Sequence, residues 1–227
     1  MEAISNIHNL FRDYFKINKY YLLVMIIASG LLILWLSRSL LISEDIFYNT
    51  YSEQLSYERS LSLFEDLKRL SWLGYVITPI GLLIKFGVIS SVLYTGVFFS
   101  DLHDRISFRD IFGVVVASES VFIVAGLSKF LWFYFSDGNY DLNDIGFFYP
   151  LSLSNLFSSA EVDKIWIYPL QILNLFQFVY ILLLSYGLYL QTGIKRSVSE
   201  KIVLISYLPG LIIWLAFIMF LSIDSSL

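Results

Sequence analysis

The sequence has no cysteine and only two histidines among its 227 residues. Without cysteine it can form no disulfide, no thiol nucleophile and no thiolate-ligated metal. Both His8 and His103 lie outside the long apolar runs, which removes a histidine site inside a membrane. Glycine-rich phosphate loops, HExxH, GxSxG and paired carboxylates are also missing. These absences predict a non-enzymatic protein with no catalytic residues, no metal and no cofactor.

Charge is scarce and unevenly placed. The net charge is -4, and the acidic residues concentrate in the segments 43–71 and 136–163. Acidic segments repel polyanions, so we expect no nucleic-acid partner.

Apolar residues are abundant. They make up 57% of the chain, above the roughly 45–50% of soluble domains. About 20 apolar residues in a helix cross the hydrocarbon core of a bilayer. Runs of that length lie near 20–42, 73–98, 111–135, 165–190 and 202–223. We therefore predict an all-α polytopic bundle of five transmembrane helices, in which residues 1–227 form one membrane domain surrounded by lipid.

The basic residues between the spans predict an orientation, because short loops rich in Lys and Arg stay in the cytoplasm. One side carries most of them: Arg12, Lys16, Lys19, Arg105, Arg109, Lys195, Arg196 and Lys201. The other side carries Arg59, Lys68, Arg69 and Lys164. This asymmetry predicts a cytoplasmic N-terminus and an outer C-terminus.

Two flanking segments, near 4–17 and 50–70, show apolar residues at helical spacing and predict amphipathic interfacial helices. The first is either a docking element or a lead-in helix packed under the bundle. The outer connection 136–164 carries the aromatic cluster Phe147, Phe148 and Tyr149 before Pro150. It is either an interfacial aromatic belt or a re-entrant or partner-binding loop.

Four ionisable residues interrupt the predicted spans: Arg38 and Lys129, which can reach the interface, and Lys85 and Glu119, which lie at compatible depths. Lys85 lies near the middle of the second span, and Glu119 lies about one turn to the cytoplasmic side of the middle of the third. A charge in hydrocarbon is costly, so we expect the two side chains to pair. The pair is either a static clamp between neighbouring helices or part of a proton or ion relay.

Three amides, Gln171, Asn174 and Gln177, follow one another at intervals of three in the fourth span. On a continuous helix that spacing places them on one face, so we predict a polar stripe toward the interior. Such amides either hold helices together by hydrogen bonds or line a substrate path. With Lys85 and Glu119 they form a predicted intramembrane polar seam.

The second half of the chain resembles the Yip family of small membrane proteins. The resemblance rests on LNLFQFVYILLLSYGLYLQTG, from Leu173 to Gly193, and on the following RSVSEKIVLISYLPGLIIWLAF. The positions that match the family pattern are Asn174, Phe176, Gly187, Leu188, Lys195 and Pro209. The resemblance implies five spans and a cytosolic N-terminus. The DLYGP stretch of eukaryotic members is missing from residues 1–18, so the chain is more similar to bacterial members, which implies a bacterial cytoplasmic membrane.

Two functions follow as expectations. The first is a non-enzymatic Yip-like scaffold or accessory subunit of a larger membrane assembly, with other membrane proteins as partners. The alternative is a small transporter or permease component in which the polar seam lines a path for a small molecule or an ion. A cavity connecting Glu119 to Gln177 would favour transport, and a dry, close-packed pair would favour a scaffold.

Overall fold

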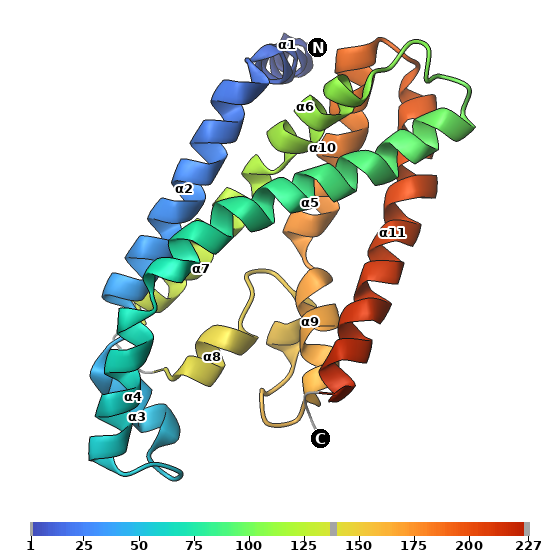
Figure 1. The fold of residues 1–227 in the computed structure, drawn as a ribbon. Coiled ribbons are helices and arrows are strands. Elements are labelled where there is room, and N and C mark those ends of the chain that lie inside the picture. The colour runs from blue at the N-terminus through green and yellow to red at the C-terminus, as the bar shows by residue number, and fades with distance from the viewer. Residues whose placement is uncertain (1, 137–139, 225–227) are drawn as a thin grey trace.

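The computed structural model describes residues 2–136 and 140–224, and these residues form a helical bundle (Figure 1). Within these two ranges there is no β-strand, only an isolated bridge between Ser152 and Asn174. The predicted all-α fold is therefore confirmed.

Five long apolar helical segments are long enough to cross a bilayer. They comprise α2 (Lys19–Leu40), α5 (Trp72–Phe99), α6 (Phe108–Ser118) with α7 (Ser120–Tyr134), α10 (Leu175–Thr192) and α11 (Arg196–Asp224). Their number agrees with the five predicted spans, and together they fit a multi-pass membrane protein. The 28-residue α5 exceeds the length needed for a perpendicular crossing, and it runs obliquely through the bundle (Figure 1).

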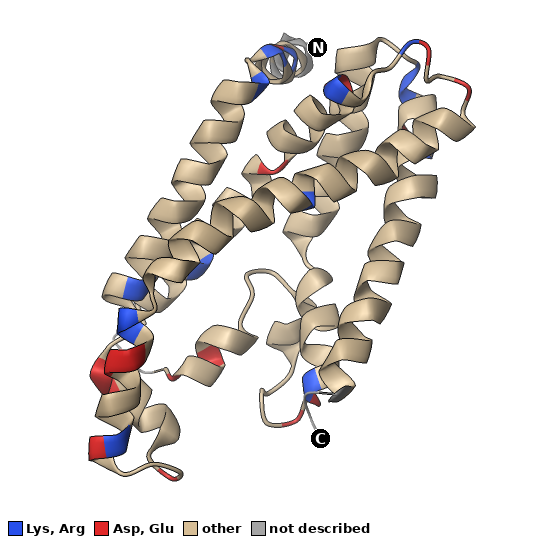
Figure 2. Ribbon diagram, in the orientation of Figure 1, with Lys and Arg blue, Asp and Glu red and all other residues tan. Residues whose placement is uncertain are grey.

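The connections between spans gather at two ends of the bundle. The N-terminus lies at the same end as the α5–α6 and α10–α11 connections, and the C-terminus lies at the opposite end (Figure 1). That opposite end carries α3 (Glu44–Tyr51), α4 (Tyr57–Arg69), α8 (Leu142–Phe147) and α9 (Lys164–Ile172). Most charged residues lie toward these two ends, and few lie between them (Figure 2).

The first interfacial helix forms nearly as predicted, as α1 (Glu2–Lys16), and it packs against the bundle. Phe15 is buried, and the Tyr14 hydroxyl donates a hydrogen bond to the Ala117 carbonyl at 2.8 Å. His8 and the Tyr186 hydroxyl lie 2.5 Å apart. These contacts favour the lead-in interpretation of this segment.

The second interfacial segment differs from the prediction of one helix near 50–70. The chain forms α3 and α4, joined by a non-helical connection over 52–56. The Ser43 side chain caps α3 by accepting a hydrogen bond from the Ile46 amide at 3.2 Å. Phe47 and Phe64 bring the two short helices together, with ring centroids 5.6 Å apart. The predicted single helix is therefore wrong, because the chain leaves the helical conformation over 52–56.

The main core lies where α6 and α10 meet, toward the N-terminal end. It is built from apolar side chains that are almost fully buried: Ile111, Val114, Val115, Val116, Leu184 and Leu188. Small residues allow close helix contacts at this end, since a Cβ placed on Gly96 would lie only 2.8 Å from the Ser206 hydroxyl oxygen. This part of the bundle is tightly packed.

Candidate ligand-binding cavity

The fourth span is broken inside the bundle. Helix α9 ends at Ile172 and α10 begins at Leu175, so the predicted span 165–190 consists of two helices. Pro169 lies in the last turn of α9 and has no amide hydrogen to continue the ladder. The Asn174 side chain then caps α10 by accepting a hydrogen bond from the Gln177 amide at 2.7 Å. Asn174 is thus the N-cap residue of α10, and it does not lie on the face of a continuous helix.

A short extended segment satisfies the backbone at this break. The Leu153 amide donates to the Leu173 carbonyl at 3.0 Å, and the Leu175 amide donates to the Leu151 carbonyl at 3.1 Å. Open backbone at membrane depth is tolerated only where protein or a cavity surrounds it. Both α9 and α10 pack against α11, which places the break beside the middle of that helix.

Glu119 lies in the third span at the junction of α6 and α7, where its backbone keeps right-handed helical angles. Lys85 on α5 donates a hydrogen bond from Nζ to Glu119 Oε1 at 2.6 Å, so the structure brings the two predicted partners together. The Lys85 ammonium also lies 4.3 Å from the centroid of the Phe122 ring. Glu119 is 3% exposed, whereas Lys85 is 40% exposed. The buried Oε2 atom of Glu119 has no hydrogen-bond partner among the described residues.

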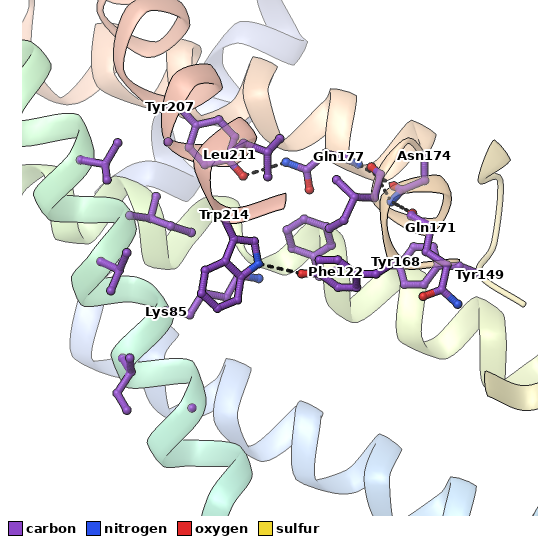
Figure 3. Close-up of a pocket in the computed structure, with 17 residues that line it drawn as sticks. Lys85, Phe122, Tyr149, Tyr168, Gln171, Asn174, Gln177, Tyr207, Leu211 and Trp214 are labelled. Carbon is purple, nitrogen blue, oxygen red and sulfur yellow. Dashed lines mark hydrogen bonds between the residues drawn. The ribbon is translucent and has the colours of Figure 1, made fainter. Parts of the chain in front are cut away.

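A cavity of about 530 Å³ lies between α5, α9, α10 and α11 (Figure 3). Its size falls within the roughly 300–1,000 Å³ of small-molecule sites. Most of the wall is apolar. Its polar and aromatic lining residues are Lys85, Phe122, Tyr149, Tyr168, Gln171, Asn174, Gln177, Tyr207 and Trp214. An apolar wall with a few convergent polar groups is typical of a ligand-binding site.

Four of the five predicted seam residues line this cavity: Lys85, Gln171, Asn174 and Gln177. Glu119 stands behind the wall and reaches it through Lys85. The amides do not form the predicted helical stripe, because the break separates Gln171 on α9 from Gln177 on α10.

The amide groups also hold the local structure. Gln171 donates hydrogen bonds to the carbonyls of Gly146 and Phe147 at 2.7 and 2.8 Å. Gln177 donates to the Tyr207 hydroxyl of α11 at 2.7 Å. These bonds connect the segment between α8 and α9, and also α11, to the broken span, so the amides stabilise the wall of the cavity.

Of the aromatic residues that line the site, only Tyr149 belongs to a cluster singled out in the sequence, and Phe122, Tyr168, Tyr207 and Trp214 were not predicted. Trp214 donates from Nε1 to the Tyr168 hydroxyl at 3.0 Å, joining α11 to α9 across the cavity (Figure 3). Tyr149 lies in the connection after α8, and burial raises its pKa to about 12. Its hydroxyl therefore stays protonated at neutral pH and can donate a hydrogen bond. Aromatic residues are common throughout this chain, so composition alone could not single out these residues.

The fold and the cavity thus define a multi-pass helical membrane protein with a ligand-sized site between its helices. Comparisons with known protein families, with curated proteins and with solved structures found no match. The resemblance to the Yip family therefore stays a prediction.

Proposed function

We propose that this protein binds a small molecule within the bilayer and works as a small transporter or permease component. One observation carries the proposal: the cavity lies where a broken span meets α5 and α11, and four seam residues line it. Discontinuous helices at membrane depth are typical of transporter substrate sites, because the break frees backbone and side chains for a ligand.

The Lys85–Glu119 pair supports the same function. Lys85 is in the cavity wall, and the carboxylate behind it has a second oxygen without a partner among the described residues. A fully satisfied buried pair is held rigidly, whereas a half-satisfied one retains capacity for a further donor. A ligand in the cavity can therefore contact the pair through Lys85, the partner that lies in the wall.

The proposed location and orientation rest on the sequence. Basic residues favour the end that carries the N-terminus and the α5–α6 and α10–α11 connections, so we place this end in the cytoplasm and the C-terminus outside. The resemblance to bacterial Yip proteins supports a bacterial cytoplasmic membrane. The proposed role is non-enzymatic.

An accessory subunit of a larger membrane assembly is the second candidate. Its support is an apolar surface outside the spans, where Leu151, Leu156 and Phe157 are exposed. Exposed apolar groups of this kind mark interaction sites on proteins. Purification at native expression followed by mass spectrometry tests it: a stoichiometric partner lost in a Leu156→Ser, Phe157→Ser variant would support this role.

Thiol accessibility tests the transporter proposal. The chain contains no cysteine, so a single introduced thiol is the only target for a water-soluble methanethiosulfonate reagent. Ile172 lines the cavity, whereas Phe178 is exposed on α10 away from it. Only the thiolate reacts, and a thiol in hydrocarbon does not ionise. We expect Ile172→Cys in bilayers to react much faster than Phe178→Cys.

Two results of that experiment are decisive. Fast labelling at 172 and slow labelling at 178 support a hydrated cavity inside the membrane. Equal, slow labelling at both positions would mean that the wall around the break is dry, and the transporter proposal would be wrong.

A further inference from the structure

The cavity has one side on the lipid-facing surface of the bundle. Ile84 and Val88 of α5 and Trp214 of α11 line it, and these residues are 61%, 55% and 47% exposed, more than a closed cavity would leave them. All three lie within the spans. The mouth between α5 and α11 therefore meets the acyl chains of the bilayer, and a molecule dissolved in the membrane can enter it sideways.

On the α5 side, the space at this mouth is next to Gly81, which has no side chain to fill it. A Cβ placed on Gly81 would meet no atom within 4 Å. On α11, by contrast, a Cβ on Gly210 would lie 3.0 Å from Val92. Helices α5 and α11 are thus close beside Gly210 and leave free space beside Gly81. Such a tapering apolar slot suits a single flexible chain.

The polar groups of the cavity are mainly hydrogen-bond donors. An ammonium has three donors, and Lys85 uses one of them on Glu119. The hydroxyls of Tyr168 and Tyr207 accept hydrogen bonds from Trp214 and Gln177, so their own protons remain to be donated. Amide hydrogens of Gln171 are already bonded to backbone carbonyls. The site therefore favours a ligand head that accepts hydrogen bonds, and the Lys85 ammonium, although paired with Glu119, is the one charged group among the described residues of the cavity wall.

Resting on the proposed function, we infer that its substrate is a long-chain carboxylate that enters from the bilayer between α5 and α11. The chain lies along the apolar wall near Ile84 and Val88, and the carboxylate accepts hydrogen bonds from Lys85 and the tyrosine hydroxyls. Burial of each methylene contributes about 0.8 kcal/mol, which already concentrates such a molecule in the membrane. The polar groups of the cavity therefore have to recognise only the carboxylate.

Protection of Ile172→Cys from labelling tests this inference in phosphatidylcholine bilayers. Palmitate, hexadecanol and hexadecyltrimethylammonium share one chain and differ in the charge of the head. At about ten times its dissociation constant, palmitate should slow labelling roughly tenfold by occupancy of the site. The neutral and cationic compounds should protect much less. Equal protection by all three, or none by palmitate, would overturn the carboxylate assignment.

Two neighbouring substitutions test the entry route. Ile84→Trp narrows the mouth and should abolish protection by palmitate, while Leu83→Trp on the same helix should preserve it, because Leu83 is exposed but does not line the cavity. Loss of protection in both variants, or in neither, would contradict lateral entry.

Lys85→Ala tests recognition of the head. Because this change leaves Glu119 unpaired, the double variant Lys85→Ala, Glu119→Gln provides a folded alternative. Palmitate protection that persists in the double variant would overturn the role of Lys85. If Ile172→Cys does not react even without palmitate, both this inference and the proposed function fail. If the thiol reacts and palmitate does not slow the reaction, only this inference fails.

Discussion

The two halves of the third span differ sharply in their surroundings. On α6, the residues from Gly113 to Ser118 are all buried. On α7, after Glu119, only Ala125, Phe130 and Phe133 are buried. The first half lies in the packed core with α1 and α10, and the second lies beside α2 at the end where the helices diverge (Figure 1). One membrane protein thus combines a tightly packed end with a more open end, and the ion pair lies at their boundary.

The largest expected effect is loss of Lys85 at that boundary. Lys85→Ala leaves the buried Glu119 without a partner, which should cost about 3–5 kcal/mol of unfolding free energy. Glu119→Gln should cost less, because Lys85 is 40% exposed. The double variant should recover part of the loss, with a coupling of about 0.5–3 kcal/mol in denaturing-detergent titrations. Strictly additive losses would show that the two side chains do not interact.

The second largest effect is a difference in stability between substitutions of two glycines, one at the packed end and one at the open end. A Cβ on Gly187 would collide with the Phe15 ring and Val114, whereas one on Gly81 would meet nothing within 4 Å. Gly187→Leu should therefore cost about 1–3 kcal/mol or more by overpacking. Gly81→Leu should leave the unfolding midpoint nearly unchanged in the same titration. Similar losses in the two variants would contradict the contrast between the ends.

A smaller effect is expected at the start of α10. Asn174→Ala removes the side-chain cap and should lower the unfolding free energy by about 1 kcal/mol. Asn174→Ser preserves an oxygen for the cap and serves as the matched control. If both substitutions have the same cost in thermal unfolding, the cap does not stabilise the break.

The smallest effect appears only at alkaline pH. Burial raises the pKa of Tyr149 from 10.0 to about 12 in the folded protein. As the pH rises, the unfolded chain releases this proton at a lower pH than the folded protein does. The contribution of Tyr149 to the free energy of unfolding should therefore be fully present below pH 10 and should be lost as the pH rises toward 12. Tyr149→Phe should flatten this part of the stability profile. An unchanged alkaline slope in the variant would show that Tyr149 is not the group responsible.

The long spans could be predicted because twenty apolar residues leave few structures other than a membrane helix. The pairing of Lys85 with Glu119 followed from depth, since neither charge is stable alone in hydrocarbon. The sequence also carries local signals for the break in the fourth span. Pro169 followed five residues later by Asn174, a favoured N-cap residue, indicates a helix end and a new start.

The cavity itself could not be predicted from the sequence. It depends on the oblique path of α5 and on contacts between Tyr168 and Trp214, which lie far apart in the chain. Helix tilt is set by packing against neighbours and not by the apolar run itself. The spacing of the amides predicted one face of a continuous helix. In the structure they lie on either side of a backbone break, and they line the same cavity because the break itself faces it.

The central claim is that a hydrated, ligand-sized site lies beside the broken fourth span. The most direct measurement is the labelling rate of single cysteines at three positions in bilayers: Ile172 in the cavity wall, Phe178 on the outside of α10 and Leu184 in the packed core. We predict fast reaction at 172 and slow reaction at 178 and 184. Slow reaction at 172, matching the other two positions, would contradict the claim.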